Sequence, residues 1–179
     1  DGKAGHRNQV YGLTEALSQL TPCHLIDVVL NDGQKGLKSL WPGKQHHLRT
    51  LPAPDLIVGA GHTTHIPMLM ACRRFGGRTV VLMKPSLPLS LFDQCYIPVA
   101  DGVAERTNVL CTEGALNRIV PSGQLDSGKG LILIGGPSDH FGWSTTGVID
   151  QVSEVICKSP DIAWSLTTSR RTPSNFAEQ

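Results

Sequence analysis

Short, almost wholly apolar runs alternate along this sequence with stretches in which apolar residues recur at helical spacing. Residues 55–61, 78–83 and 131–136 read DLIVGAG, RTVVLM and LILIGG, and glycine or proline lies close to each run. Near-continuous apolar strands are typical of parallel sheets that helices cover on both faces. The alternation therefore predicts an α/β fold built from Rossmann-like parallel sheets.

The same periodicities assign most of the chain to helices or strands. Residues 8–20 read as an amphipathic helix. A second helix over 66–75 is expected to end at the glycine pair that follows it, since glycine takes the left-handed conformation that closes a helix. A third helix is expected over about 145–157. Strands are predicted at 23–30, 55–61, 78–83, 94–100, 108–112, 131–136 and 163–169.

A polar stretch divides this pattern into two domains. Residues 121–129, PSGQLDSGK, carry glycine and serine without any periodicity, as a linker does. An N-terminal Rossmann-like domain is therefore expected over 1–120, and the beginning of a second one over 130–179. Because the sequence opens on DGKAGH without a methionine and the second domain is short, we expect the chain to be part of a longer protein.

The composition argues against several classes of protein. Sixteen basic against fifteen acidic residues give a net charge of +1, which implies neither a nucleic-acid groove nor a polybasic membrane surface. No apolar run approaches the roughly 20 residues of a transmembrane helix. The five cysteines have neither zinc nor disulfide spacing and are typical of reduced thiols. We therefore expect a cytoplasmic protein without nucleic-acid partners or a transmembrane segment.

Ligands of parallel α/β sheets bind at the carboxyl ends of the strands, so the loops there form the candidate site. The first such loop, residues 1–9, reads DGKAGHRNQ and directly precedes a predicted helix. Gly2 and Gly5 would let the backbone approach a ligand, and His6 could act as a base. The alternative is that the glycines only form a tight turn and that His6 caps the helix.

A second loop of the first domain, GAGHTTH at residues 59–65, contains two histidines. His62 and His65 are three apart and could share a helix face, but without a third ligand they make a poor metal site, and no metal is expected. Capping of the following helix by Thr63 or Thr64 is the favoured alternative.

Lys84 and a pair of loops in the second domain could bind an anion. Lys84 stands where a strand ends, so it either reaches a phosphate or carboxylate or is simply solvated. GGPS at 135–138 and TSRRTP at 168–173 each follow a predicted strand. Their amides and hydroxyls, with the guanidinium groups of Arg170 and Arg171, together suit a diphosphate. The alternative is that the two arginines form a solvated or interface patch.

Six motifs together resemble one known family. They are DGKAGHRNQVYGLTEAL, PDLIVGAGHTTH, LMKPSLPLSLFD, EGALNRI, LIGGPSDHFGW and TSRRTP, and they follow one another from residue 1 to residue 173. With them the chain resembles the mitochondrial fission Elm-type family. Bacterial members of that family were long filed as a domain of unknown function and are often labelled nucleoside-diphosphate-sugar epimerases. The plant relative is a fission factor on the mitochondrial surface that recruits a dynamin-related protein.

The resemblance implies two Rossmann-like domains that face a cleft, as in GT-B glycosyltransferases. DGKAGH would then face the acceptor, with His6 or Asp1 as the catalytic base. The family's later serine-rich motif, expected near the donor phosphates, does not occur in this sequence. The residues expected on the acceptor side are Gly2, Lys3, Gly5, Asn8, Gln9, Gly61, His62 and Lys84. The residues expected to bind the donor phosphates are Gly135, Gly136, Pro137, Ser138, Ser169, Arg170, Arg171 and Thr172.

Two functions follow as alternatives. The first is metal-independent transfer of a hexosyl group from a nucleotide diphosphate sugar, without a cofactor, to an acceptor such as a lipid-linked or cell-envelope glycan. Peripheral contact with the inner membrane would fit such an acceptor. The second is a non-catalytic, glycosyltransferase-like scaffold that recruits a protein partner through the loop at 31–50 and needs neither His6 nor Arg170. An epimerase is not expected, because the sequence has neither a GxxGxxG loop nor a YxxxK pair.

Common nucleotide and hydrolase motifs are also absent from the sequence. It contains no Walker GxxxxGK[ST] loop, no GxGxxG dinucleotide fingerprint and no GxSxG elbow. Neither dehydrogenase nor hydrolase chemistry is therefore favoured.

Overall fold

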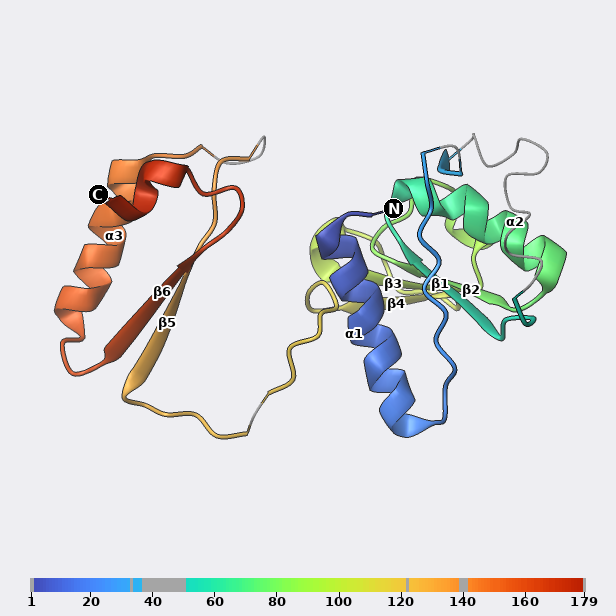
Figure 1. The fold of residues 1–179 in the computed structure, drawn as a ribbon, viewed down its shortest axis with the longest axis horizontal. Coiled ribbons are helices and arrows are strands. Elements are labelled where there is room, and N and C mark those ends of the chain that lie inside the picture. The colour runs from blue at the N-terminus through green and yellow to red at the C-terminus, as the bar shows by residue number, and fades with distance from the viewer. Residues whose placement is uncertain (1, 33, 37–50, 122, 139–141, 179) are drawn as a thin grey trace. The chain divides into compact units, whose positions relative to one another are not determined.

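The computed structural model of the chain describes residues 2–32, 34–36, 51–121, 123–138 and 142–178 (Figure 1). The chain divides into two compact units, residues 1–120 and 121–179. Most of the predicted loop at 31–50, on which the scaffold alternative depends, lies outside the described residues.

The first unit is built on a parallel sheet of four strands in the order β1-β2-β3-β4. These strands are β1 (Leu56–Ala60), β2 (Arg78–Leu82), β3 (Gln94–Pro98) and β4 (Val109–Thr112). Each was expected from an apolar run, and the predicted α/β class with a Rossmann-like parallel sheet is confirmed. Since the strands are parallel, their carboxyl ends lie at one edge of the sheet, and we call this edge the carboxyl edge of the first unit.

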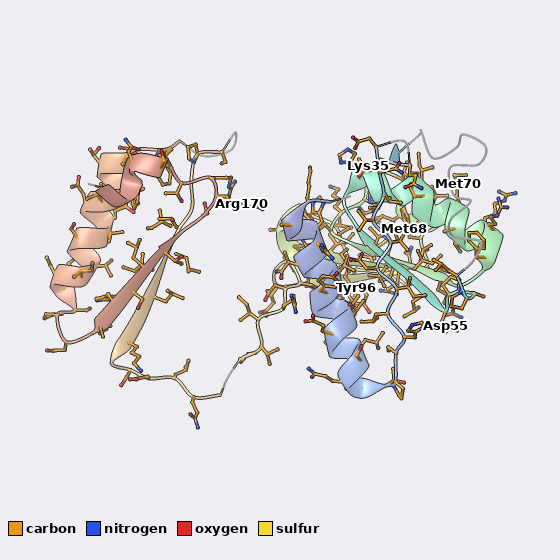
Figure 2. The ribbon with its side chains drawn as sticks, in the orientation of Figure 1. Lys35, Asp55, Met68, Met70, Tyr96 and Arg170 are labelled. Atoms are coloured by element: carbon orange, nitrogen blue, oxygen red, sulfur yellow. The ribbon has the colours of Figure 1, made fainter. Side chains whose placement is uncertain are left out.

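Two helices, α1 (Ala4–Leu20) and α2 (His65–Phe75), flank this sheet (Figure 1). Alternate side chains of β2 pack on opposite faces of the sheet. Val81 packs with Met68 of α2, whereas Val80 and Leu82 belong to the cluster that includes Val10 of α1. Figure 2 shows Met68 and Tyr96 among the side chains of the two layers. Because both faces are covered, β1 and the central part of β2 are apolar on both faces, which is the pattern seen in the sequence.

The glycine pair after α2 closes the helix, as predicted. Gly76 and Gly77 both have positive φ, 82° and 84°, and the Gly76 amide donates to the Cys72 carbonyl at 2.9 Å. A Cβ atom on Gly77 would collide with the carbonyl of Pro54. The sharp turn into β2 therefore depends on glycine at this position.

The predicted strand at residues 23–30 is wrong. No strand is assigned there, and Leu25, Ile26 and Val29 are exposed. Side chains hold the segment instead, because Asp27 accepts hydrogen bonds from Arg7 and Tyr11 of α1, each at 2.7 Å. An apolar run forms a strand only when a neighbouring backbone completes its ladder, and within the described residues no strand pairs with the outer side of β1.

The chain passes over α1 again after β4. A Cβ atom on Gly12 would collide with the backbone of Asn117, so the two backbones are in direct contact. Arg118 pairs with Glu15 at 2.6 Å, and its guanidinium lies over the Tyr11 ring. This contact ties the end of the first unit to its first helix.

The second unit contains a parallel pair of strands, β5 (Lys129–Ile134) and β6 (Ala163–Thr168), which α3 (Thr145–Lys158) connects. The Ser144 hydroxyl caps α3 by accepting from the Gly147 amide at 3.2 Å. Both strands end at the same edge, and the two candidate phosphate loops follow them there.

Candidate functional site

The first turn of α1 takes up most of the residues that were predicted to form a loop. The helix begins at Ala4 rather than at residue 8, and the Arg7 amide donates to the Lys3 carbonyl at 3.0 Å. The predicted loop at 1–9 is therefore wrong for most of its length, since a single glycine weakens a helix by only about 1 kcal/mol and does not exclude one. The helix contains Gly5, His6, Asn8 and Gln9. Gly2 and Lys3 precede the helix, and Asp1 lies outside the described residues.

His6 is half-buried in this first turn. Burial lowers the pKa of its imidazole, and the charge of Lys3 lowers it further. At neutral pH the ring is therefore uncharged and carries a nitrogen lone pair, which is the form that a proton acceptor needs.

Gln9 is buried and holds α1 against the end of β2. It is 8% exposed, and its Nε2 atom donates to the sulfur of Met83 at 3.1 Å. Met83 directly follows β2 and has a φ of 71°. This left-handed conformation is strained for a residue other than glycine, and such strain is often found at functional sites. The contact places the start of α1 at the carboxyl edge of the first unit, although Gln9 itself is used for packing.

His62 and His65 differ in their exposure to solvent. Gly61 has a φ of 91° and precedes a short 3-10 helix, η3 (His62–Thr64), in which His62 is exposed. His65 begins α2 and is only 2% exposed. Its ring packs edge-on against Phe92, with the ring centroids 5.5 Å apart.

The buried His65 has a polar neighbour at the same edge of the sheet. Its Nδ1 atom lies 3.3 Å from the hydroxyl of Ser86, in the loop after β2. Burial lowers the pKa of His65, and the nearby His62 lowers it further. The imidazole is thus neutral, and its contacts with Phe92 and with the exposed Ser86 hydroxyl fix its position.

The threonines of this loop do not cap α2, contrary to the prediction. Thr64 occupies the cap position with helical backbone angles, and its hydroxyl donates to the Gly61 carbonyl at 2.7 Å. Thr63 has a buried hydroxyl oxygen with no hydrogen-bond partner in the described part of the chain. Since η3 runs directly into α2, the helix has no extended residue that could serve as a cap.

Lys84 is exposed and lies beside Asp101, in the short 3-10 helix η5 (Val99–Asp101) after β3. Its Nζ atom donates to the Asp101 carbonyl at 3.3 Å, and its amide donates to the Asp101 carboxylate at 3.4 Å. Asp101 therefore holds the loop after β2 through both its backbone carbonyl and its carboxylate. The phosphate-binding role of Lys84 stays a prediction.

The loops after β5 and β6 are in contact within the second unit. The Ser169 amide donates to the Ile134 carbonyl at 3.0 Å, and the Thr172 hydroxyl donates to the Gly135 carbonyl. A Cβ atom on Gly136 would collide with the Arg171 backbone. The two candidate phosphate loops are therefore packed backbone to backbone, and the glycine is needed for that contact.

Two guanidinium groups extend from this joined pair of loops. Arg170 and Arg171 are both exposed, and Figure 2 shows Arg170 projecting from the turn after β6. Gly135 is exposed beside them and Gly136 is partly exposed. An anion at this edge could accept hydrogen bonds from two guanidinium groups and from backbone amides, and these are the donors typical of a phosphate site.

Other expected residues contribute less to a described site. Pro137 is exposed, and Ser138 is half-buried.

The side chains that the structure describes contain no cluster of three His, Cys, Asp or Glu residues that could hold a metal ion. None of the helices in the described ranges has the length and apolar character needed to cross a membrane.

Sequence reasoning missed Met83, Ser86 and Asp101 at the carboxyl edge of the first unit. Asp101 carried a usable signal, because it precedes Gly102 in an Asp-Gly pair that favours a turn, and Gly102 has a φ of 65°. The positive φ of Met83 had no sequence signal, since methionine rarely adopts it.

A family model described as mitochondrial fission ELM1 matches residues 4–179, nearly the whole chain. No curated protein matches the chain significantly, and no solved structure does.

Proposed function

This chain belongs to the mitochondrial fission ELM1 family, and we propose that it acts as part of a glycosyltransferase that uses a nucleotide diphosphate sugar. The observation that carries the proposal is the contact between the loops after β5 and β6. There Gly136 packs on the Arg171 backbone, and Arg170 and Arg171 remain exposed at the carboxyl edge of β5 and β6.

The arginines supply the charge that the reaction needs. When a sugar is transferred, the bond between its anomeric carbon and the diphosphate oxygen breaks, and the diphosphate leaves with the electron pair. Arg170 and Arg171 stabilise that developing negative charge. Because these groups perform the role that a divalent cation plays elsewhere, we propose that the transfer is metal-independent.

His6 is the proposed proton acceptor. As the acceptor hydroxyl attacks the anomeric carbon, its proton passes to the neutral imidazole, whose pKa burial and Lys3 keep low. In this proposal the second unit binds the donor and the first unit binds the acceptor. Lys84 and the Gly61–His62 turn lie at the carboxyl edge of the first unit, as His6 does. The acceptor class remains a lipid-linked or cell-envelope glycan, and the site of action is the cytoplasmic side of the inner membrane.

Thermal unfolding of the chain with a panel of nucleotides and nucleotide sugars tests the proposal. A ligand at 100 times its dissociation constant raises the stability by about 2.7 kcal/mol. We expect one nucleotide diphosphate and its sugar to raise the unfolding temperature, with and without EDTA. Arg170→Ala and Arg171→Ala should abolish the shift.

Arg74→Ala is the matched control, because Arg74 is an exposed arginine of α2 in the first unit. It should leave the shift unchanged. A wild-type chain that responds to no nucleotide diphosphate would contradict the proposal, and so would a shift that Arg170→Ala and Arg171→Ala leave intact.

A scaffold that recruits a protein partner is the second candidate. Its specific support is the fission role in the family's description, together with the exposed apolar side chains of Leu25, Ile26 and Val29. A chain that ignores the whole nucleotide panel, and whose partner binding survives both Arg170→Ala and His6→Gln, would favour this function.

A further inference from the structure

Thr172 uses its hydroxyl inside the second unit, between the two loops of the proposed donor site. The oxygen accepts a hydrogen bond from the Ser169 amide at 2.9 Å. The hydroxyl donates to the Gly135 carbonyl and, at 3.2 Å, to the carbonyl of Ile134, the last residue of β5. One side chain thus bonds to both loops.

The backbone of the turn after β6 is closed by the same residues. The Thr172 amide donates to the Ser169 carbonyl at 3.0 Å, and the Arg171 amide donates to the Ser169 hydroxyl at 3.2 Å. Arg170 and Arg171 lie between these anchors. The direction in which the arginines leave the turn therefore depends on how Ser169 and Thr172 are held.

The loop after β5 begins with two glycines. Gly135 and Gly136 follow the strand directly, and glycine gains more conformational freedom than other residues when it is released. The Thr172 hydroxyl and the contact between Gly136 and the Arg171 backbone fix this loop against the turn.

We infer that Thr172 is a positioning residue, whose hydroxyl holds the Gly135–Gly136 segment and the Arg170–Arg171 turn together as one preformed diphosphate site. This inference rests on the proposed function for its ligand, but the link between the loops is a property of the unliganded chain. A preformed site binds more tightly, because its groups need not be ordered when the ligand arrives.

The test compares Thr172→Val, which keeps the side-chain shape and removes the hydroxyl, with Thr172→Ser, which keeps the hydroxyl. Thr167→Val is the matched control, because Thr167 is an exposed threonine of β6 in the same unit. The affinity of the whole chain for the nucleotide diphosphate found in the panel is measured by calorimetry. Hydrogen exchange of peptides covering 133–137 and 168–173 is measured without ligand.

We expect Thr172→Val to weaken binding about fivefold to tenfold, the loss typical of one hydrogen bond. The backbone amides of its two loops should exchange their hydrogens faster than those of the wild type. Thr172→Ser and Thr167→Val should match the wild type in both affinity and exchange rate. Binding and exchange that are both unchanged in Thr172→Val would overturn the inference.

The two proposals fail in different ways. If the wild type binds no nucleotide diphosphate, the proposed function fails, and hydrogen exchange still decides whether Thr172 links the loops. If the wild type binds and Thr172→Val binds equally well, only the positioning role fails. Should Thr172→Val lose its folded circular dichroism signal, the same comparison is made with Thr172→Ala, and equal affinity there would also overturn the inference.

Discussion

Asp93 and Thr79 are joined by three hydrogen bonds between the start of β2 and the approach to β3. The Asp93 carboxylate accepts from the Thr79 amide and from its hydroxyl, both at 2.8 Å, and the Asp93 amide donates to the same hydroxyl at 3.0 Å. Thr79 is only 1% exposed, so its polar groups have no water to replace these bonds. The pair fixes two neighbouring strands of the first unit at the edge opposite the candidate site.

The first prediction concerns Asp93→Asn. Hydrogen bonds from the Thr79 amide and hydroxyl lower the pKa of Asp93. A lowered folded-state pKa means that the charged carboxylate stabilises the fold above the unfolded value of about 3.9, and that this stabilisation is lost as the pH falls through the folded value. We expect Asp93→Asn to cost about 1 kcal/mol at neutral pH.

Urea unfolding followed by circular dichroism, at neutral pH and at about pH 3, checks this. The gap between wild type and Asp93→Asn should shrink in acid, because below about pH 3.9 the unfolded carboxylate binds a proton that the folded carboxylate, with its lowered pKa, binds less readily. A gap of the same size at both pH values would show that the charge of Asp93 contributes nothing.

The second prediction compares two adjacent glycines in the loop after β5. Gly136→Ala would place a Cβ atom against the Arg171 backbone, which cannot yield without moving the turn after β6. We expect a loss of about 1–3 kcal/mol in the stability of the second unit. Gly135→Ala meets nothing within 4 Å, so it should change the stability little.

Tryptophan fluorescence can follow this unfolding, because Trp143 and Trp164 both lie in the second unit. Equal unfolding temperatures for the two alanine variants would mean that the loops are not packed as described.

The third prediction makes the same comparison within α1. Alanine is favoured over glycine in a helix by about 1 kcal/mol, so on propensity alone Gly5→Ala and Gly12→Ala should both be neutral or stabilising. Gly12→Ala should instead destabilise the first unit, because its Cβ atom would collide with the Asn117 backbone, whereas Gly5 has open space around it.

Thermal unfolding by circular dichroism measures both variants of α1. Gly5→Ala also addresses function: a loss of acceptor use with unchanged stability would show that the ligand approaches the backbone there. A stabilised Gly12→Ala variant would contradict the packing of residue 117 on the helix.

The sequence predicted strands and helices well wherever the spacing of apolar residues follows from which side chains are buried. The runs behind β1 and β2 are mostly apolar because α1 and α2 cover opposite faces of one sheet. Residues 23–30 have a similar apolar run and form no strand, because pairing depends on which backbone lies alongside. A local pattern holds no information about that neighbour.

The candidate site was less predictable, because side-chain roles depend on tertiary contacts. The sequence indicated that Gln9 and Thr172 were polar residues near ligand loops, yet the amide of Gln9 contacts Met83 and the hydroxyl of Thr172 bonds to the Gly135 carbonyl. The spacing of His65 from His62 suggested a shared helix face, yet His65 is buried against Phe92. Each of these contacts joins residues from separate elements, which no spacing rule connects.

The last prediction concerns the ionisation of His6, which the proposed reaction requires to be uncharged. Burial and the charge of Lys3 lower the pKa of His6, so its NMR titration midpoint should lie below the usual value of about 6.5. Lys3→Met removes one of the causes and should move the midpoint upward, toward 6.5 but not to it, because burial remains.

His65 provides the internal reference in the same spectra. Its pKa is lowered by burial and by His62, not by Lys3, so its midpoint should stay in place in the Lys3→Met variant. If both midpoints moved together, the substitution would have altered the fold and not the local charge. A His6 midpoint at or above the usual value in the wild type would leave the residue at least half protonated at about pH 6.5, and it would contradict the claim that burial and Lys3 keep the proposed base uncharged.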